Sequence, residues 1–289
     1  MRIVDGNITA LRALLARQIP KTNGRNYGFL HAGETPTPTL PRSTGGGGKE
    51  SRRCFHTGLT AVDEIAPGGG FRCGAIHELL FPPPQPSPGV PGEGEKRVPG
   101  EGERPKSFAL LLARAAQSAT SGVIVWSDPR REVYPVAVSA AGIDLRRLIL
   151  LRPRNAANEL SALNECLRCR GASATVANLN RLSDIEARRL QLAAERGGGV
   201  GIFLRPMLKD AAGNYAAATR WLVRCALGEA NRQRWIIELL HGHGGRLGST
   251  VLLEVDRETG EWRASPPSVR ASAELADRPA VTPQARATA

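Results

Sequence analysis

The chain has 289 residues, with 39 Lys and Arg against 27 Asp and Glu, so its formal net charge is +12 and its sequence pI is near 10.3. This length allows one sizeable core with tails, and the charge favours an acidic partner such as nucleic acid, although Arg outnumbers Lys so strongly that genome composition is an equally good explanation. Because no segment approaches the ~20 apolar residues of a membrane span and the five Cys are scattered, we expect a cytoplasmic, nucleoid-associated protein, not a membrane protein or a secreted disulfide scaffold.

The first 19 residues predict a short amphipathic helix. Ile8, Leu11, Leu14 and Leu15 share one helical face. Residues 20–54 carry Pro, Thr and Gly without periodicity and predict a flexible linker. A helix tethered in this way is expected to dock on a partner rather than on its own core, which makes these four side chains candidate partner-binding residues.

The folded core is expected over residues 55–265. A Gly-rich turn, "APGGGFRCG", leads into an apolar strand at Ala75–Phe81. Residues 82–105 then interrupt the fold with Pro and Gly and a near-repeat, "VPGEGEKR" followed by "VPGEGERP", which indicates a low-complexity insertion. Residues 266–289 return to the composition of a tail and are expected to be disordered.

Between residues 106 and 206, helical and strand patterns alternate. Helices are predicted at 106–119, 132–143, 158–171 (ended by Gly171) and 183–199 (begun by Ser183), and strands at 122–128, 147–153, 173–179 and 200–206. Continuous apolar strands in such an alternation predict an α/β fold with a mostly parallel sheet covered by helices on both faces. Three further strand patterns at 219–225, 232–241 and 249–256 predict a C-terminal antiparallel extension.

Three stretches in this order carry a family resemblance. They are "TGLTAVDEIAPGGGFRCGAIHEL", "SDPRREVYPVAVSAAGIDLRRLILLRP", and "TRW" followed by "WIIELLHGHGG". Together they resemble the core of RecA-type ATPases, and most closely the ImuA family, over residues 55–262 without the insertion. The resemblance implies a RecA-like sheet and a role in SOS-induced translesion DNA synthesis. It also implies two partners, an inactive relative of the Y-family polymerases and an error-prone replicative-type polymerase, with RecA as a further candidate.

The phosphate-binding loop expected of such a core is damaged. The loop needs the pattern G-x-x-x-x-G-K-[ST], whose glycines let backbone N–H groups face the phosphates. Only "GEGERPKS" fits, supplying Gly100, Lys106 and Ser107 but placing Pro105 where the second glycine belongs. Proline removes one N–H and stiffens the backbone, so Lys106 and Ser107 are expected to form the first turn of an ordinary helix. Weak residual binding of ATP and Mg²⁺ is the alternative.

Three further residues depart from the pattern that the resemblance implies. Arg130 occupies the place of the water-activating Glu, and a guanidinium cannot act as a general base. Asn178 and Asn180 stand at a strand end where a metal-binding Asp is expected. Glu132 and Asp184 lack the offsets needed to substitute for these groups. We therefore expect no catalytic residue, no metal site and no cofactor.

Other motifs have more ordinary explanations. In "CLRC", Cys166 and Cys169 lack a second ligand pair and are expected to be structural, and "HGHGG" with His241 and His243 favours a turn. One strand face presents Arg220 and Arg224, and one face of the next strand presents Arg232 and Arg234. These four arginines are candidate contacts to nucleic acid, with cross-strand ion pairing as the equal alternative, while Trp221 and Trp235 are expected in the core.

The sequence thus predicts a non-hydrolysing scaffold that binds polymerases during error-prone repair, with DNA as a further candidate partner. The alternatives are a RecA-type, DNA-dependent ATPase with an atypical loop, and a SulA-like inhibitor of cell division.

Overall fold

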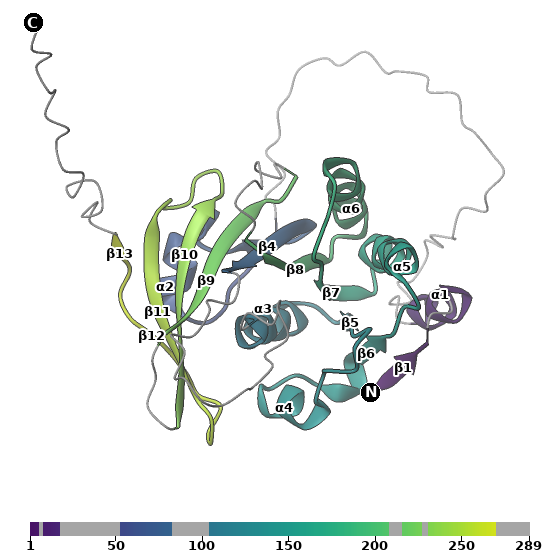
Figure 1. Cartoon of the computed structure of the whole chain (residues 1–289), viewed down its shortest axis with the longest axis horizontal. Helices are drawn as coiled ribbons and strands as arrows, with labels where there is room; N and C mark the ends of the chain where they lie inside the picture. Colours follow the sequence, from purple (N-terminus) through teal and green to yellow (C-terminus); the bar gives the residue numbers. More distant parts are fainter. Residues whose placement is uncertain (6–7, 18–52, 83–103, 208–215, 227–230, 270–289) are drawn as a thin grey trace, which may run out of the picture.

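The computed structural model describes residues 1–5, 8–17, 53–82, 104–207, 216–226 and 231–269. These residues build one large mixed sheet in the order β1-β6-β5-β7-β8-β4-β9-β10-β11-β12, and β13 also pairs with β11 (Figure 1). A separate two-stranded sheet joins β2 (Cys54–Phe55) to β3 (Phe71–Arg72). The expected linker 20–54 lies outside the described residues apart from its last two positions, and residues 83–103 of the insertion and 270–289 of the tail lie outside them too.

The first six strands of that order are parallel. They are β1 (Arg2–Val4), β6 (Leu148–Leu151), β5 (Val123–Ser127), β7 (Ala172–Asn178), β8 (Val200–Pro206) and β4 (Ala75–Phe81). All but β1 were predicted from their continuous apolar runs, and β4 has the predicted bounds. The strand β1 was not predicted, because three residues are too short to show a period.

The sheet becomes antiparallel after β9 (Thr219–Ala226), which pairs parallel with β4 and antiparallel with β10 (Arg232–His241). β10 pairs antiparallel with β11 (Ser249–Asp256), and β11 with β12 (Trp262–Ala264) and β13 (Ser268–Val269). The predicted α/β class with a C-terminal antiparallel extension is therefore confirmed. Because β13 lies within residues 266–289, the fold extends further into the expected tail than the composition indicated.

Helices lie on both faces of the sheet (Figure 1). α2 (Thr60–Ile65) and α3 (Lys106–Ala119) share one apolar cluster with the antiparallel strands, centred on Phe108, Trp221 and Trp235. α5 (Ala156–Arg168) and α6 (Asp184–Gly197) pack together in a second cluster. The short α4 (Pro135–Ala140) connects β5 to β6. Helices on both faces explain why the parallel strands are apolar throughout.

Helix boundaries follow local capping chemistry. Ser183 and Glu186 form a capping box at the start of α6, and Gly198, with φ 78°, ends that helix in the left-handed region. The start at Ser183 and an end within the glycines at 197–199 were predicted, whereas the part played by Glu186 was not. α5 instead ends at Arg168, three residues before Gly171, because the chain turns at Cys169 to enter β7.

The N-terminal helix α1 (Ile8–Ala16) corrects one expectation. Leu11 and Leu15 are fully buried in a cluster with Val4, Ile149 and Cys166 of the same chain. The Arg12 guanidinium also donates to Glu165 of α5, with Nη2 and Oε1 3.0 Å apart. The prediction that this face waits for a partner is therefore wrong for Leu11 and Leu15, while Ile8 and Leu14 are half-buried. Strand β1 places the helix against the sheet edge, which the sequence pattern alone did not reveal.

Candidate functional site

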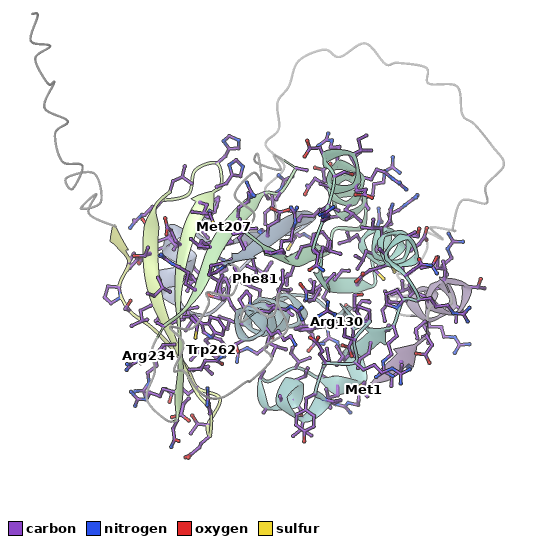
Figure 2. All side chains as sticks on the ribbon, viewed as in Figure 1. Met1, Phe81, Arg130, Met207, Arg234 and Trp262 are labelled. Carbon is purple, nitrogen blue, oxygen red and sulfur yellow. The ribbon has the colours of Figure 1, made fainter. Side chains whose placement is uncertain are left out.

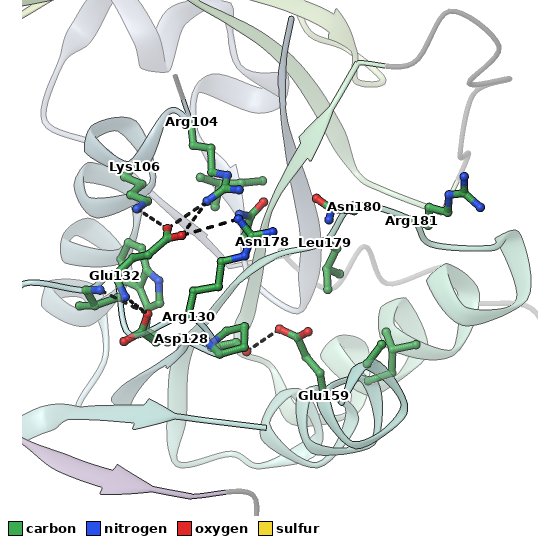
Figure 3. A pocket seen from close by; sticks show the side chains of 17 residues that line it. Arg104, Lys106, Asp128, Arg130, Glu132, Glu159, Asn178, Leu179, Asn180 and Arg181 are labelled. Carbon is green, nitrogen blue, oxygen red and sulfur yellow. Dashed lines mark hydrogen bonds and ion pairs between the residues drawn. The ribbon is translucent and has the colours of Figure 1, made fainter. Parts of the chain in front are cut away.

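A cavity of about 460 Å³ opens where β5, β7 and β8 end, beside the first residues of α3 and α5 (Figure 3). Its walls combine apolar side chains such as Trp126, Leu160 and Leu204 with several charged groups. The carboxyl ends of parallel strands are the usual place for ligands in an open α/β sheet. This cavity is therefore the candidate site.

The charged groups of the cavity converge on the carboxylate of Glu132. Lys106 Nζ lies 2.8 Å and Arg104 Nη1 2.9 Å from Glu132 Oε2, and Arg130 Nη1 lies 3.8 Å from Oε1. Burial raises the pKa of Glu132, but the hydrogen bond from Lys106 and the charges of Lys106 and Arg104 outweigh it, so the pKa is lower than usual. Glu132 is consequently an anion that three cations share (Figure 3).

The turn after β5 fixes the position of that carboxylate. Asp128 Oδ1 accepts hydrogen bonds from the backbone N–H groups of Glu132, at 2.7 Å, and Val133, at 3.2 Å. Arg131, directly before Glu132, has φ 58°, a conformation that a non-glycine residue adopts at a cost of about 1 kcal/mol or more. The other carboxylate oxygen of Asp128, Oδ2, is buried and has no hydrogen-bond partner within the described part of the chain.

A second buried carboxyl group, that of Glu159, lies at the start of α5. Its Oε1 accepts a hydrogen bond of 2.5 Å from Ser127 Oγ at the end of β5. Burial raises the pKa of Glu159 and the Ser127 hydrogen bond opposes that rise only in part. The group is thus suited to hold a proton inside the cavity. The sequence reasoning missed Glu159, and the available signal was an acidic residue in the first turn of a helix that follows a parallel strand.

Two of the three predicted residues of the degenerate phosphate loop can be placed. Lys106 and Ser107 lie in the first turn of α3, as expected, and Pro105 precedes them at the N-cap position. Ser107 Oγ donates to Gln233 Oε1 of β10 at 3.0 Å, so its hydroxyl is engaged with the antiparallel extension. Gly100 lies outside the described residues.

The substituted positions lie at the same cavity. Arg130, Asn178 and Asn180 all line it. In the amide orientation that satisfies both of its atoms, Asn178 accepts from Arg104 Nε at 2.8 Å and donates to the Leu204 carbonyl at 3.2 Å. The three residues that depart from the expected pattern therefore line one cavity, and Glu132 lines it with them. Asp184, by contrast, begins α6 and does not line the cavity.

The four arginines of the antiparallel extension are engaged in ion pairs across the sheet. Arg220 contacts Glu78, Arg224 contacts Glu238, and both Arg232 and Arg234 contact Glu254. The alternative of cross-strand pairing is confirmed for all four. Trp221 and Trp235 are buried in the core, as predicted.

The remaining motifs show no reactive arrangement. Cys166 and Cys169 are buried free thiols, and burial raises the pKa of each. His241 ends β10, with its ring 5.6 Å from that of His243 in the turn that follows. Within the described part of the chain, no three His, Cys, Asp or Glu side chains cluster as metal ligands would, and no helix is long and apolar enough to cross a membrane.

Comparison with known proteins identifies the family. No family model matches the chain. Two curated relatives, each described as Protein ImuA and each from a strain of Caulobacter vibrioides, are 30% identical to it over 213 aligned residues, and the alignment covers 68% of this chain and 81% of the relative. The chain belongs to the ImuA family. Alignment over most of the relative's length extends the similarity well beyond the short motifs quoted above.

Proposed function

We propose that this ImuA-family protein is a non-hydrolysing accessory protein of SOS-induced translesion synthesis, acting as a scaffold for polymerases. The observation that carries the proposal is the contact of Glu132 with Lys106 and Arg104. In a working phosphate loop, the lysine at this place binds the terminal phosphates of the nucleotide. Here its charge is already neutralised by a carboxylate of the same chain, which would repel a phosphate.

The chemistry of the neighbouring positions supports the same conclusion. Hydrolysis needs a general base for water and a carboxylate for Mg²⁺. Arg130 has no lone pair to accept a proton, and Asn178 uses its amide on Arg104 and Leu204. Asp128 Oδ2, a carboxylate oxygen with no hydrogen-bond partner among the described residues, belongs to a residue that is only 4% exposed.

The proposed partners are the inactive Y-family polymerase relative and the error-prone replicative-type polymerase, with RecA and DNA as further candidates. Since Leu11 and Leu15 are buried, we place the partner surface at the sheet edge formed by β1. Met1 directly precedes this edge strand and Ile3 lies within it, and the two residues are 44% and 45% exposed (Figure 2). An edge strand with exposed apolar side chains is a template for pairing with another chain.

Nucleotide binding and turnover test the proposal directly. Wild-type protein and Lys106→Ala are titrated with a fluorescent ATP analogue and Mg²⁺, and phosphate release is followed with and without single-stranded DNA. We expect neither binding nor turnover. Binding and DNA-stimulated turnover that Lys106→Ala abolishes would instead establish the DNA-dependent ATPase.

Pull-downs with each polymerase test the scaffold role. Ile3→Asp is expected to weaken capture, whereas Ile185→Asp, at a 76% exposed position on α6, serves as the matched control and leaves capture unchanged. Capture of a tubulin-like division protein with neither polymerase retained would favour the SulA-like division inhibitor.

A further inference from the structure

The cation cluster at the mouth of the cavity, formed by Arg104, Lys106 and Arg130, is built around one anion. The side chain of Arg104 is only 9% exposed, and both its contacts to Glu132 and its contact to Asn178 are made inside the cavity. A guanidinium with so little water around it requires a negative partner. Without Glu132, three positive charges would face a cavity of about 460 Å³, a size in the range of small-molecule sites.

The backbone, and not only the ion pairs, holds Glu132 in that position. Two N–H groups of the turn, those of Glu132 and Val133, donate to Asp128 Oδ1, and Arg131, which directly precedes Glu132, is kept at φ 58°. A non-glycine residue persists in this region where its surroundings over-determine it. The turn therefore costs conformational free energy to maintain, and the two hydrogen bonds to Asp128 offset that cost.

We infer that Glu132 is an internal occupant of an oxyanion site, and that the cation cluster binds a phosphate or carboxylate group of a ligand whenever Glu132 is withdrawn or neutralised. Arg104, Lys106 and Arg130 all line the same cavity, so their charges would face the entering anion together. The inference rests on the proposed function, since it explains why the unmodified chain should not bind nucleotide.

The test neutralises Glu132 while keeping its shape. Glu132→Gln and wild-type protein are titrated with inorganic pyrophosphate by calorimetry, and thermal unfolding is followed over the same concentrations. The matched control is Glu165→Gln, because Glu165 is also partly exposed and paired with an arginine, Arg12, but lies on α5 away from the cavity. Circular dichroism establishes that each variant is folded.

We expect Glu132→Gln to bind pyrophosphate at least 10-fold more tightly than wild type or the control, and its Tm to rise by about 5 °C at 100 times the Kd. Adding Arg104→Gln to Glu132→Gln should remove this gain. Malonate replaces pyrophosphate in a second arm, and its relative affinity distinguishes a carboxylate from a phosphate ligand. Equal affinity of wild type and Glu132→Gln, or no binding by either, would overturn the inference.

The two proposals fail separately. If Glu132→Gln gains no anion binding and wild type hydrolyses no ATP, the internal occupant is wrong while the scaffold proposal stands. If wild type binds and hydrolyses ATP in a Lys106-dependent manner, the scaffold proposal is wrong whatever Glu132→Gln does.

Discussion

Glu78, on the central strand β4, offers the sharpest test of how this sheet is stabilised. Its side chain is 1% exposed and lies between two arginines from the neighbouring strands. Arg205 Nη1 of β8 is 2.6 Å from Glu78 Oε1, and Arg220 Nε of β9 is 3.1 Å from Oε2. The substitution Glu78→Gln keeps the shape of the side chain and removes only its charge.

The magnitude follows from burial. The two arginine side chains are 11% and 14% exposed, so water cannot replace the lost carboxylate at either of them. Removing one member of a buried ion pair costs about 3–5 kcal/mol, because an uncompensated charge remains. A protein of this size has about 5–15 kcal/mol of total stability, so the variant should lose a large share of it.

Urea unfolding followed by tryptophan fluorescence and circular dichroism measures the effect. With an m-value of about 2 kcal/mol/M, the midpoint should fall by about 2 M. Glu261→Gln is the control, since Glu261 pairs with Arg263 at a surface position where both side chains are about 60% exposed, and its effect should stay below about 0.5 kcal/mol. A loss below about 1 kcal/mol for Glu78→Gln would refute the reasoning. Replacing all three charges by Arg205→Met, Glu78→Leu and Arg220→Met should restore most of the stability.

Three further predictions concern other buried positions. Burial lowers the pKa of His77 to about 4, below its ordinary value of 6.5. Between these two pH values the unfolded chain binds a proton at His77 that the folded chain does not, so the free energy of unfolding should fall by about 2 kcal/mol from pH 7.5 to 5. Urea unfolding at each pH measures this change. This part of the pH slope should vanish in His77→Gln, and an unchanged slope would contradict the assignment. Gly197→Ala should cost about 3 kcal/mol, because the new Cβ would lie 1.9 Å from the Leu167 carbonyl oxygen, and an unshifted thermal midpoint would show that α6 moves freely away from α5. Leu11→Ala should cost about 2–4 kcal/mol by calorimetry and half-buried Ile8→Ala clearly less, whereas equal losses would argue against the packing of α1 on its own chain.

Much of the fold could be predicted because its signals are local. Continuous apolar runs marked β4, β5, β6, β7 and β8, and their alternation with helical periods indicated a parallel sheet. The capping box at Ser183 and the glycine at 198 set the bounds of α6 from a few neighbouring residues. Alternation likewise placed Trp221 and Trp235 in the core and the arginines of β9 and β10 on the other face.

The candidate site was predicted only in part. Pro105 could be read as a departure from the phosphate-loop pattern because its spacing from Gly100 and Lys106 is local. Arg130 and Asn178 could be read as departures from the pattern that the family resemblance implies at two strand ends. Nothing local showed that Glu132 meets Lys106 across 26 residues, or that Glu159 meets Ser127 across 32. These contacts depend on which strand ends the sheet order brings together.

The sequence by itself therefore determined the secondary elements, the fold class and the loss of the phosphate-loop pattern, since each depends on residues within one turn or one strand. Only the tertiary structure decided which apolar and charged side chains are buried or paired within the chain. Leu11 and Leu15 became core because β1 joins the sheet edge beside β6, and the four arginines became ion-pair partners because their strands lie next to Glu78, Glu238 and Glu254. Such outcomes depend on contacts between distant segments, and neither periodicity nor composition carries information about which segments become neighbours.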